Sequence, residues 1–381
     1  MDSDRAPGPP PLGDLKILDF SRVLAGPFAT MMLADLGADV LKVERPGVGD
    51  ETRSWGPPHD DHGQATYFQA VNRNKRSVAI DLSGEPGRTR ARSLAAGADV
   101  IVENFRPGVM DRLGLGYEEL SRDHAELVYC SITGFGAGPG AELPGYDLLV
   151  QALGGLMSIT GAPDGEPQKV GVALVDVLAG LFASVGILAA LRHRDHTGEG
   201  QRVEVNLLSS LLAALVNQAS GYTIAGVVPG RMGNAHPSIS PYELYETGAG
   251  DLVLAVGNDR QFAALCEVIG APELASDPRF ASNTERVTHR AQLRAELVMR
   301  LAAAPAADWA RRLTAARVPA GEVNDLSGAF ELAQSLGLAP TVEVPRADGS
   351  TVALTRNPIA LSHTPPSYRT APPPPPPPPE D

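Results

Sequence analysis

The sequence predicts an α/β protein in which a large Rossmann-like domain with a parallel sheet is followed by a smaller α+β domain. In the first half of the 381 residues, short apolar runs alternate with helical patterns, and such βαβ units require a parallel sheet. From residue 222 the composition changes to short strands, helices and loops punctuated by Gly and Pro. Strand patterns over residues 341–346 and 350–356 predict that the chain then returns to the large domain.

The composition is typical of a soluble globular protein, since 43% of the residues are hydrophobic and 20% are charged. The formal net charge of -13 argues against a nucleic-acid partner, which would need a basic face. No apolar run of membrane-spanning length is free of breakers and charges, and no signal core precedes the fold. We therefore expect no membrane segment and take the cytoplasm as the default, which suits Cys130 and Cys266 as buried free thiols.

The chain opens with a Pro- and Gly-rich stretch, residues 1–13, which we expect to be a flexible tail. A buried strand is predicted over residues 15–21, and Pro27 then begins a helix that ends near Gly37. A second strand follows over residues 39–45. The turn between the first strand and the helix reads RVLAGP, so the GxGxxG fingerprint is absent and NAD is not an expected cofactor.

Further strands are predicted after a basic cluster at residues 73–76 and over residues 98–105, 127–133 and 200–206. Ligands of such folds bind beyond the carboxyl ends of the parallel strands, so the loops there predict a ligand site. Polar side chains in or near these loops are Arg45, Lys75, Asn104 and Tyr146. The basic cluster itself fits either a phosphate-binding edge or a solvated loop.

The sequence is organised around Asp176, an acidic residue at the start of an apolar run that continues to Leu191. The apolar positions go almost all the way round a helix, which predicts that this helix is buried. Gly180 and Gly186 inside the run indicate that another backbone packs close to it. Asp176 fits a helix N-cap. It also fits a nucleophile, because a carboxylate at a helix N-terminus is expected to stay ionised and can attack an activated carbonyl.

These patterns divide the chain into consecutive segments, and no internal repeat is found. After the flexible tail, the expected segments are a large domain over 14–221, a small domain over 222–325, a return segment over 326–370 and a polyproline tail over 371–381. The eight prolines of that tail predict an extended segment outside the fold.

Several blocks of the sequence resemble the class III CoA-transferases, or CaiB/BaiF-like proteins, a family that also contains the α-methylacyl-CoA racemases. The blocks in the large domain include LADLGADVLKVERPGVGDETR, NRNKRSVAIDL, ADVIVENFRPGVMDRLGLGYEEL, SITGFGAGPG, PGYDLLVQALGGLMSITG and RVEVNLL. Those in the small domain are GRMGNAHPSISPYELY, AVGNDRQF and DPRFASNTERV. The resemblance covers roughly residues 15–365 and implies the family's fold and an interlocked homodimer.

The resemblance implies that Asp176, in LVDVLAG, is the catalytic nucleophile. It would form a mixed anhydride with the acyl group and then carry CoA as an aspartyl thioester until an acceptor carboxylate takes it over. The racemases pair this aspartate with a histidine at the position of Tyr146, whose hydroxyl is a poor proton shuttle at neutral pH. The expected activity is therefore CoA transfer between carboxylic acids, with succinyl-CoA as a candidate donor. The alternatives are a 2-methylacyl-CoA racemase and a non-catalytic CoA-thioester-binding protein.

The resemblance also implies which residues bind CoA, and no metal or cofactor beyond the CoA thioester. The positions that match the CoA site are Leu24, Ala25, Arg45, Lys75, Asn104, Phe105 and Arg112. The supporting active-site residues are Tyr146, Met232, Gly233 and Asn234. Arg45 also fits a surface ion pair with Glu44 or Asp50, and the Gly233 loop also fits a turn between domains.

Overall fold

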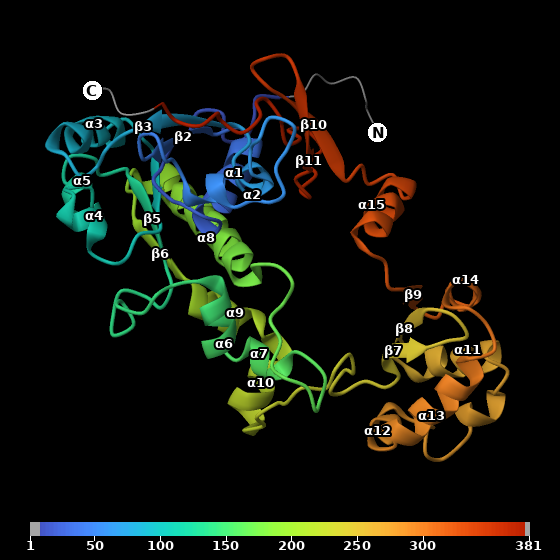
Figure 1. Ribbon diagram of the computed structural model, residues 1–381. Coiled ribbons are helices and arrows are strands. Elements are labelled where there is room, and N and C mark those ends of the chain that lie inside the picture. Colours follow the sequence, from blue (N-terminus) through green and yellow to red (C-terminus); the bar gives the residue numbers. More distant parts are fainter. Residues whose placement is uncertain (1–7, 378–381) are drawn as a thin grey trace. The chain divides into compact units, whose positions relative to one another are not determined.

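The structure is a computed structural model that describes residues 8–377, and its contacts divide the chain into two units (Figure 1). The large unit contains the residues up to Leu156, Lys169–Val227 and the residues from Ala339 onward; the small unit contains Met157–Gln168 and Val228–Leu338. The small unit therefore differs from the expected span of 222–325: residues 222–227 belong to the large unit, whereas an insertion before the long apolar helix and the helix preceding Ala339 belong to the small one. The return segment accordingly begins at Ala339 and not at residue 326.

A parallel six-stranded sheet in the order β3-β2-β1-β4-β5-β6 forms the centre of the large unit, which confirms the expected parallel α/β architecture. Ile17 on β1 lies opposite Val40 on β2 and Val100 on β4. The chain changes winding direction between β1 and β4, and folds of this kind have a crevice beyond the carboxyl ends of the strands there. The strands are β1 (Lys16–Asp19), β2 (Asp39–Glu44), β3 (Lys75–Ala79), β4 (Val100–Glu103), β5 (Val128–Thr133) and β6 (Arg202–Asn206).

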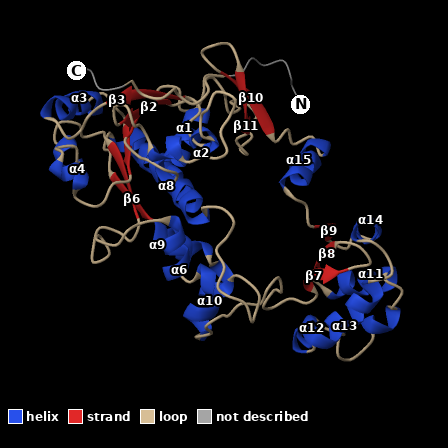
Figure 2. Ribbon diagram, viewed as in Figure 1, coloured by secondary structure: helices blue, strands red, loops and turns tan. Residues whose placement is uncertain are grey.

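Helices cover both faces of this sheet (Figure 2). Successive residues of a strand point to opposite faces, so the central strands contribute apolar side chains to a core on either side. Ile17 and Val100 pack under α1 and α8, whereas Leu18 and Ile101 pack under α3 and α4 on the other face. The helices of the large unit are α1 (Ala25–Asp35), η1 (Glu51–Ser54), α2 (Thr66–Ala70), α3 (Glu85–Ala95), α4 (Val109–Arg112), α5 (Tyr117–Leu120), α6 (Asp147–Leu153), α8 (Leu174–Thr197), α9 (Leu207–Ala214) and α10 (Val216–Ala225). An antiparallel hairpin, β10 (Thr341–Pro345) and β11 (Thr351–Thr355), completes the unit.

The prediction that α8 is buried all round is wrong. One face packs into the core, but Leu181, Phe182, Val185 and Leu188 on the other are between 38% and 64% exposed. The close approach inferred from Gly180 is found, because a Cβ there would lie 2.6 Å from a backbone oxygen of α1. Among the described residues, α8 alone is long and apolar enough by length and composition to cross a membrane, and core helices of soluble proteins also pass this test. Asp176, Gly180 and Gly186 interrupt its apolar run, as the sequence analysis noted.

Both predicted tails contact the large unit within the residues that the structure describes. Leu12 packs against the core of the large unit. The Gly47 N–H donates to the carbonyl oxygen of Pro377 at 3.0 Å. The expectation of a flexible leading tail and of a polyproline segment outside the fold is therefore wrong for residues 8–13 and 371–377. The remaining tail residues, 1–7 and 378–381, lie outside the part of the chain that the structure describes.

The small unit is α+β, with helices packed against a three-stranded antiparallel sheet in the order β7-β8-β9. Its own core includes Phe262, Leu265 and Trp309, all nearly inaccessible to solvent. Its elements are α7 (Leu156–Ile159, which starts at the boundary), β7 (Tyr242–Glu246), β8 (Asp251–Ala255), α11 (Asp259–Val268), η2 (Pro272–Ala275), α12 (Asn283–Thr288), α13 (Arg290–Leu301), α14 (Ala306–Ala315), β9 (Ala320–Glu322) and α15 (Leu326–Ser335).

Candidate active site

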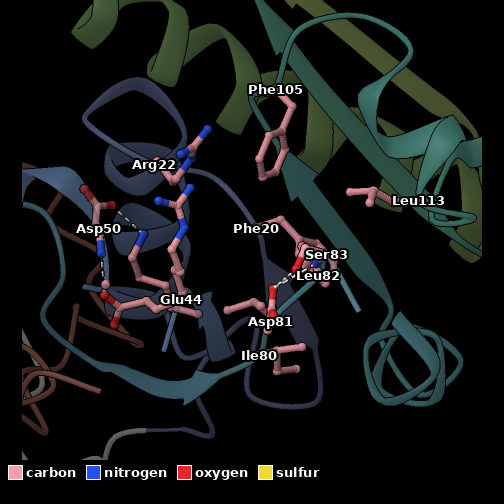
Figure 3. Close-up of a pocket in the computed structure, with 14 residues that line it drawn as sticks. Phe20, Arg22, Glu44, Asp50, Ile80, Asp81, Leu82, Ser83, Phe105 and Leu113 are labelled. Carbon is pink, nitrogen blue, oxygen red and sulfur yellow. Dashed lines mark hydrogen bonds and ion pairs between the residues drawn. The ribbon is translucent and has the colours of Figure 1, made fainter. Parts of the chain in front are cut away.

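A cavity of about 280 Å³ lies beyond the carboxyl ends of β1, β2 and β4, at the point where the strand order reverses. Figure 3 shows Arg22 and Asp50 on one side of it and Phe105 and Leu113 on the other. The guanidinium of Arg22 lies 4.7 Å from the centre of the Phe105 ring, a cation–π contact. The cavity thus offers apolar and aromatic walls with a cation at the edge, which suits a nucleotide.

Arg45 also lines this cavity, as the resemblance implies. The alternative reading, in which Arg45 pairs with Glu44 or Asp50, does not fit the structure, because both carboxylates have other partners. Glu44 pairs with Arg53 at 2.7 Å, and Asp50 pairs with Lys42 at 2.9 Å. Arg45 is exposed at the end of β2 and makes no ion pair with any described residue, so its guanidinium is available to an anionic ligand.

A second cavity of about 90 Å³ adjoins the first, since Phe105 lines both. Ala25 and Asn104 line it too, so three of the expected CoA-binding residues lie along one continuous edge of the sheet. Asp176 also lines this second cavity. The candidate nucleophile is therefore placed next to the cavity that suits a nucleotide, and a thioester attached to that nucleotide would extend towards it.

The interpretation of Asp176 as a helix N-cap is wrong. The residue before α8 is Ala173, whose side chain cannot cap, and Asp176 is the third residue of the helix. The cap comes instead from Asp147 at the start of α6. One oxygen of its carboxylate accepts hydrogen bonds from the backbone N–H groups of Val175 at 2.8 Å and Asp176 at 3.3 Å. Because Asp147 satisfies the helix end, the Asp176 side chain is not used for capping.

The carboxylate of Asp176 receives no hydrogen bond or ion pair from any described residue, although the residue is only partly exposed to solvent. Burial and, to a smaller degree, the charge of Asp147 raise the pKa of Asp176 to about 7. The expectation that the helix N-terminus keeps this carboxylate fully ionised at neutral pH is therefore corrected, because desolvation and a like charge outweigh the helix dipole. Such a group is a more basic and more reactive nucleophile once it ionises than an ordinary carboxylate.

Lys75 is not a CoA ligand, which corrects the sequence-based expectation. Its side chain is completely enclosed by the protein and pairs with Asp19 at 3.2 Å. The ammonium also donates to the backbone oxygen of Pro27 at 2.9 Å and to the side-chain oxygen of Asn72 at 3.0 Å. Burial lowers the pKa of Lys75 to about 8 even though the carboxylate of Asp19 opposes that shift. The side chain of Lys75 is thus buried between the sheet and α1, and it lines neither of the two cavities.

The other expected site residues line neither the 280 Å³ cavity nor the 90 Å³ cavity, and their roles stay predictions. Leu24 immediately precedes α1, Arg112 is exposed at the end of α4, and Tyr146 is 66% exposed just before α6. The remaining three belong to the small unit, where Gly233 has a φ of +61° and its N–H donates to the oxygen of Gly161 at 3.0 Å. The residues of this turn are Met232, Gly233 and Asn234.

The sequence analysis missed two residues of this site, Arg22 and Asp147. Arg22 directly follows the first strand, so the rule that ligands bind at the carboxyl ends of strands could have found it. Asp147 stands next to Tyr146 in the same motif, but its function depends on a contact with a helix start far along the chain. Local sequence carries no signal for that contact.

The fold and these cavities define an α/β enzyme that places an unpaired carboxylate beside a nucleotide-sized cavity. The sequence profile of CoA-transferase family III matches residues 12–375. The chain is 44% identical over 370 residues to the succinate–glutarate CoA-transferase of Agrobacterium fabrum, covering 94% of this chain and 91% of that one. It is 46% identical over 327 residues to the succinyl-CoA:glutarate CoA-transferase of Mus musculus, covering 86% and 75%. The protein therefore belongs to CoA-transferase family III, which confirms the resemblance and the expected enzyme class.

The solved structures agree with this assignment. A CAIB/BAIF family protein from Brucella suis matches the present fold with a TM-score of 0.85 and 43% sequence identity, over 96% of each chain. These comparisons favour the transferase over the two alternatives, the racemase and the non-catalytic binding protein.

Proposed function

We propose that this enzyme transfers CoA from succinyl-CoA to glutarate or a dicarboxylic acid of similar length, with Asp176 as the nucleophile. The observation that carries the proposal is the position of Asp176, whose unpaired carboxylate lines a cavity that shares Phe105 with the nucleotide-sized cavity. We take the donor and the acceptor from the names of the two relatives, both of which contain glutarate together with succinate or succinyl-CoA.

The reaction begins when one oxygen of the Asp176 carboxylate attacks the thioester carbonyl of succinyl-CoA. The carbon–sulfur bond breaks, leaving a succinyl–aspartyl anhydride and the CoA thiolate. The thiolate then attacks the aspartyl carbonyl, which releases succinate and leaves CoA bound to Asp176 as a thioester. The acceptor carboxylate reverses these two steps: it displaces the thiolate to form a new anhydride, and the thiolate attacks the acceptor's carbonyl to regenerate free Asp176. Each step exchanges one acyl bond for another and no atom changes its oxidation state, so no redox partner is required.

Chain residues outside the nucleophile bind and orient the substrate in this proposal. Arg45, at the edge of the larger cavity, neutralises phosphate groups of CoA, and Phe105 covers the base. Arg22 lies at the same edge with its guanidinium already paired to Glu51 at 3.0 Å, so it contributes mainly its contact with Phe105. Asp147 holds the start of α8, which fixes the direction of the Asp176 side chain. Its charge also raises the energy of the ionised nucleophile.

We further propose that the enzyme is a homodimer, interlocked as the resemblance implies, and that it works in the cytoplasm. Leu181, Phe182, Val185 and Leu188 form an exposed apolar stripe along α8, the helix that carries the nucleophile. Apolar surface of this kind marks an interface, and a second copy of the chain would bury it. The free thiols Cys130 and Cys266 suit a reducing compartment.

Intact-mass spectrometry during incubation with succinyl-CoA tests the proposed chemistry. The wild-type protein should gain the mass of CoA less one water, and Asp176→Asn should gain nothing and show no turnover with glutarate. A panel of dicarboxylates from oxalate to adipate identifies the acceptor. If α-deuterium exchange into a branched acyl-CoA occurred without any acceptor acid, the enzyme would be a racemase and the proposed transfer would be wrong.

A further inference from the structure

A strained turn, Arg22–Val23–Leu24, lies at the edge of the nucleotide-sized cavity and presents Arg22 to it. Val23 has a φ of +68°, in the left-handed region that β-branched residues almost never occupy. Such a conformation persists only when the surroundings hold it in place, and it is found preferentially at functional sites. The turn directs Arg22 over the ring of Phe105, and both residues line the cavity.

Two side chains hold the backbone of this turn, one at Arg22 and the other at Val23. The side-chain amide of Asn104 makes both of its hydrogen bonds to Arg22, accepting from the backbone N–H at 2.8 Å and donating to the backbone oxygen at 2.7 Å. The carboxylate of Asp50 accepts from the N–H of Val23 at 3.3 Å, at the strained residue itself. Asp50 also accepts from the backbone N–H and the hydroxyl of Thr52, which fixes the carboxylate in position.

Asp50 is in turn held by Lys42, whose ammonium lies 2.9 Å from the carboxylate in an ion pair with no solvent exposure on either side. The same ammonium donates to the backbone oxygen of Ser21 at 2.7 Å, immediately before the turn. One buried cation therefore fixes both the start of the turn and the group that holds its strained residue. A buried ion pair is expensive and is often less stabilising than apolar side chains of the same size, so overall stability is a weak explanation for this pair.

We propose that the Lys42–Asp50 ion pair is a positioning pair that keeps the Arg22–Leu24 turn in its binding conformation and so determines the affinity of the enzyme for CoA thioesters. This inference rests on the proposed function, because it takes the cavity to hold the nucleotide part of CoA. Neither Lys42 nor Asp50 takes part in the chemistry. When the pair is broken, the turn relaxes from the strained conformation and only a fraction of the molecules is competent to bind.

The test compares Asp50→Asn with a matched control at a second buried ion pair. Asp35 and Arg73 lie 2.6 Å apart with almost no exposure in the same unit, but neither residue lines either site cavity. Dissociation constants for CoA itself, measured by calorimetry, keep this test separate from the question of turnover. For Asp50→Asn we expect the dissociation constant for CoA and the KM for succinyl-CoA to rise about tenfold or more with kcat within about threefold. Asp35→Asn should lower the unfolding temperature without changing either constant.

A second variant separates positioning from simple destabilisation. Glycine adopts the conformation of Val23 without strain, so Val23→Gly should restore much of the CoA affinity in the Asp50→Asn background. Equal losses of affinity in Asp50→Asn and Asp35→Asn, or an unchanged CoA affinity in folded Asp50→Asn, would overturn the proposal. If Asp50→Asn does not fold, hydrogen exchange of the wild-type enzyme decides: the peptide spanning residues 20–26 should be protected without CoA, and rapid exchange there would refute the inference. If the wild-type enzyme bound CoA but showed no turnover of succinyl-CoA with any dicarboxylate, the proposed function would be wrong and the positioning role of the ion pair would still stand.

Discussion

Replacing Asp176 by asparagine should stabilise the protein, even though it removes the proposed nucleophile. Asparagine has nearly the same shape, and no described group donates to the carboxylate that it would replace. The pKa of Asp176 is raised from its ordinary 3.8 to about 7 by burial and by Asp147. The folded protein therefore keeps a proton that the unfolded chain has already released between these pH values. Stability falls as the pH rises through this window, and the whole penalty is present above pH 7.

The size of the penalty follows from the shift. At about 1.4 kcal/mol per pKa unit, a shift of roughly three units is worth about 4 kcal/mol at pH 8 and, by the same linkage relation, about 2 kcal/mol at pH 5. Asp176 is partly accessible to solvent, so screening by water should reduce these values to about half. The expected gain for Asp176→Asn is thus about 2 kcal/mol at pH 8, which corresponds to a rise in Tm of roughly 2–4 °C for a protein of this size.

Thermal unfolding of the wild type and of Asp176→Asn at pH 5, 6.5 and 8 measures this gain. Asp61→Asn serves as the control, because Asp61 is an exposed aspartate in a loop of the same unit. The stabilisation should grow with pH for Asp176→Asn only. If the gain were the same at all three pH values, or if the variant were less stable at pH 8, the carboxylate would not be the desolvated, unpaired group described above.

Three further predictions concern the reaction and the assembly. The kcat/KM for succinyl-CoA should rise with pH through about 7, since only ionised Asp176 attacks the thioester in the proposed mechanism. Asp147→Asn should move the midpoint of this profile to lower pH, because it removes the neighbouring negative charge, and a flat profile would contradict the prediction. Arg45→Ala should raise the KM for succinyl-CoA about tenfold and leave kcat nearly unchanged, since an exposed arginine binds phosphate but does not touch the reacting carbon; an effect confined to kcat would refute it. If the enzyme is the proposed homodimer, Val185→Asp should convert it to monomers in light scattering after size-exclusion chromatography, because the substitution places a charge in the apolar stripe of α8. Asp61→Asn should leave the proposed dimer intact.

The sequence was sufficient for the fold because the strands and helices of the large unit carry strong local patterns. The six strands predicted between residues 15 and 206 all appear in the parallel sheet, and the helix that begins beside Pro27 ends where Gly37 indicates. The rule for ligands at strand ends also pointed to Arg45 and Asn104, which line the cavities. Periodicity and position relative to a strand end are properties of neighbouring residues, so they can be read without knowing the tertiary contacts.

The errors have a different physical origin, because each depends on contacts between distant residues. Lys75 was expected to face a phosphate, but its buried ammonium pairs with Asp19 on β1, two strands away in the same sheet. The run after Asp176 was expected to be buried, yet a single chain covers only one of the apolar faces of α8. An apolar pattern predicts that a surface will be covered, and it does not say whether the same chain covers it.

The N-terminus of α8 illustrates how such a distant contact creates reactivity. From the sequence, capping and catalysis were alternatives for one carboxylate, because a helix start needs an acceptor and Asp176 was the acidic residue nearby. The structure supplies a second carboxylate, since Asp147 accepts the N–H groups of Val175 and Asp176. This division leaves Asp176 desolvated, without a hydrogen-bond donor and beside a like charge, the three conditions that raise the pKa of an acid. In the proposed mechanism the reactivity of the site therefore arises from the pair: Asp147 stabilises the helix end and also destabilises the ionised form of Asp176, the proposed nucleophile.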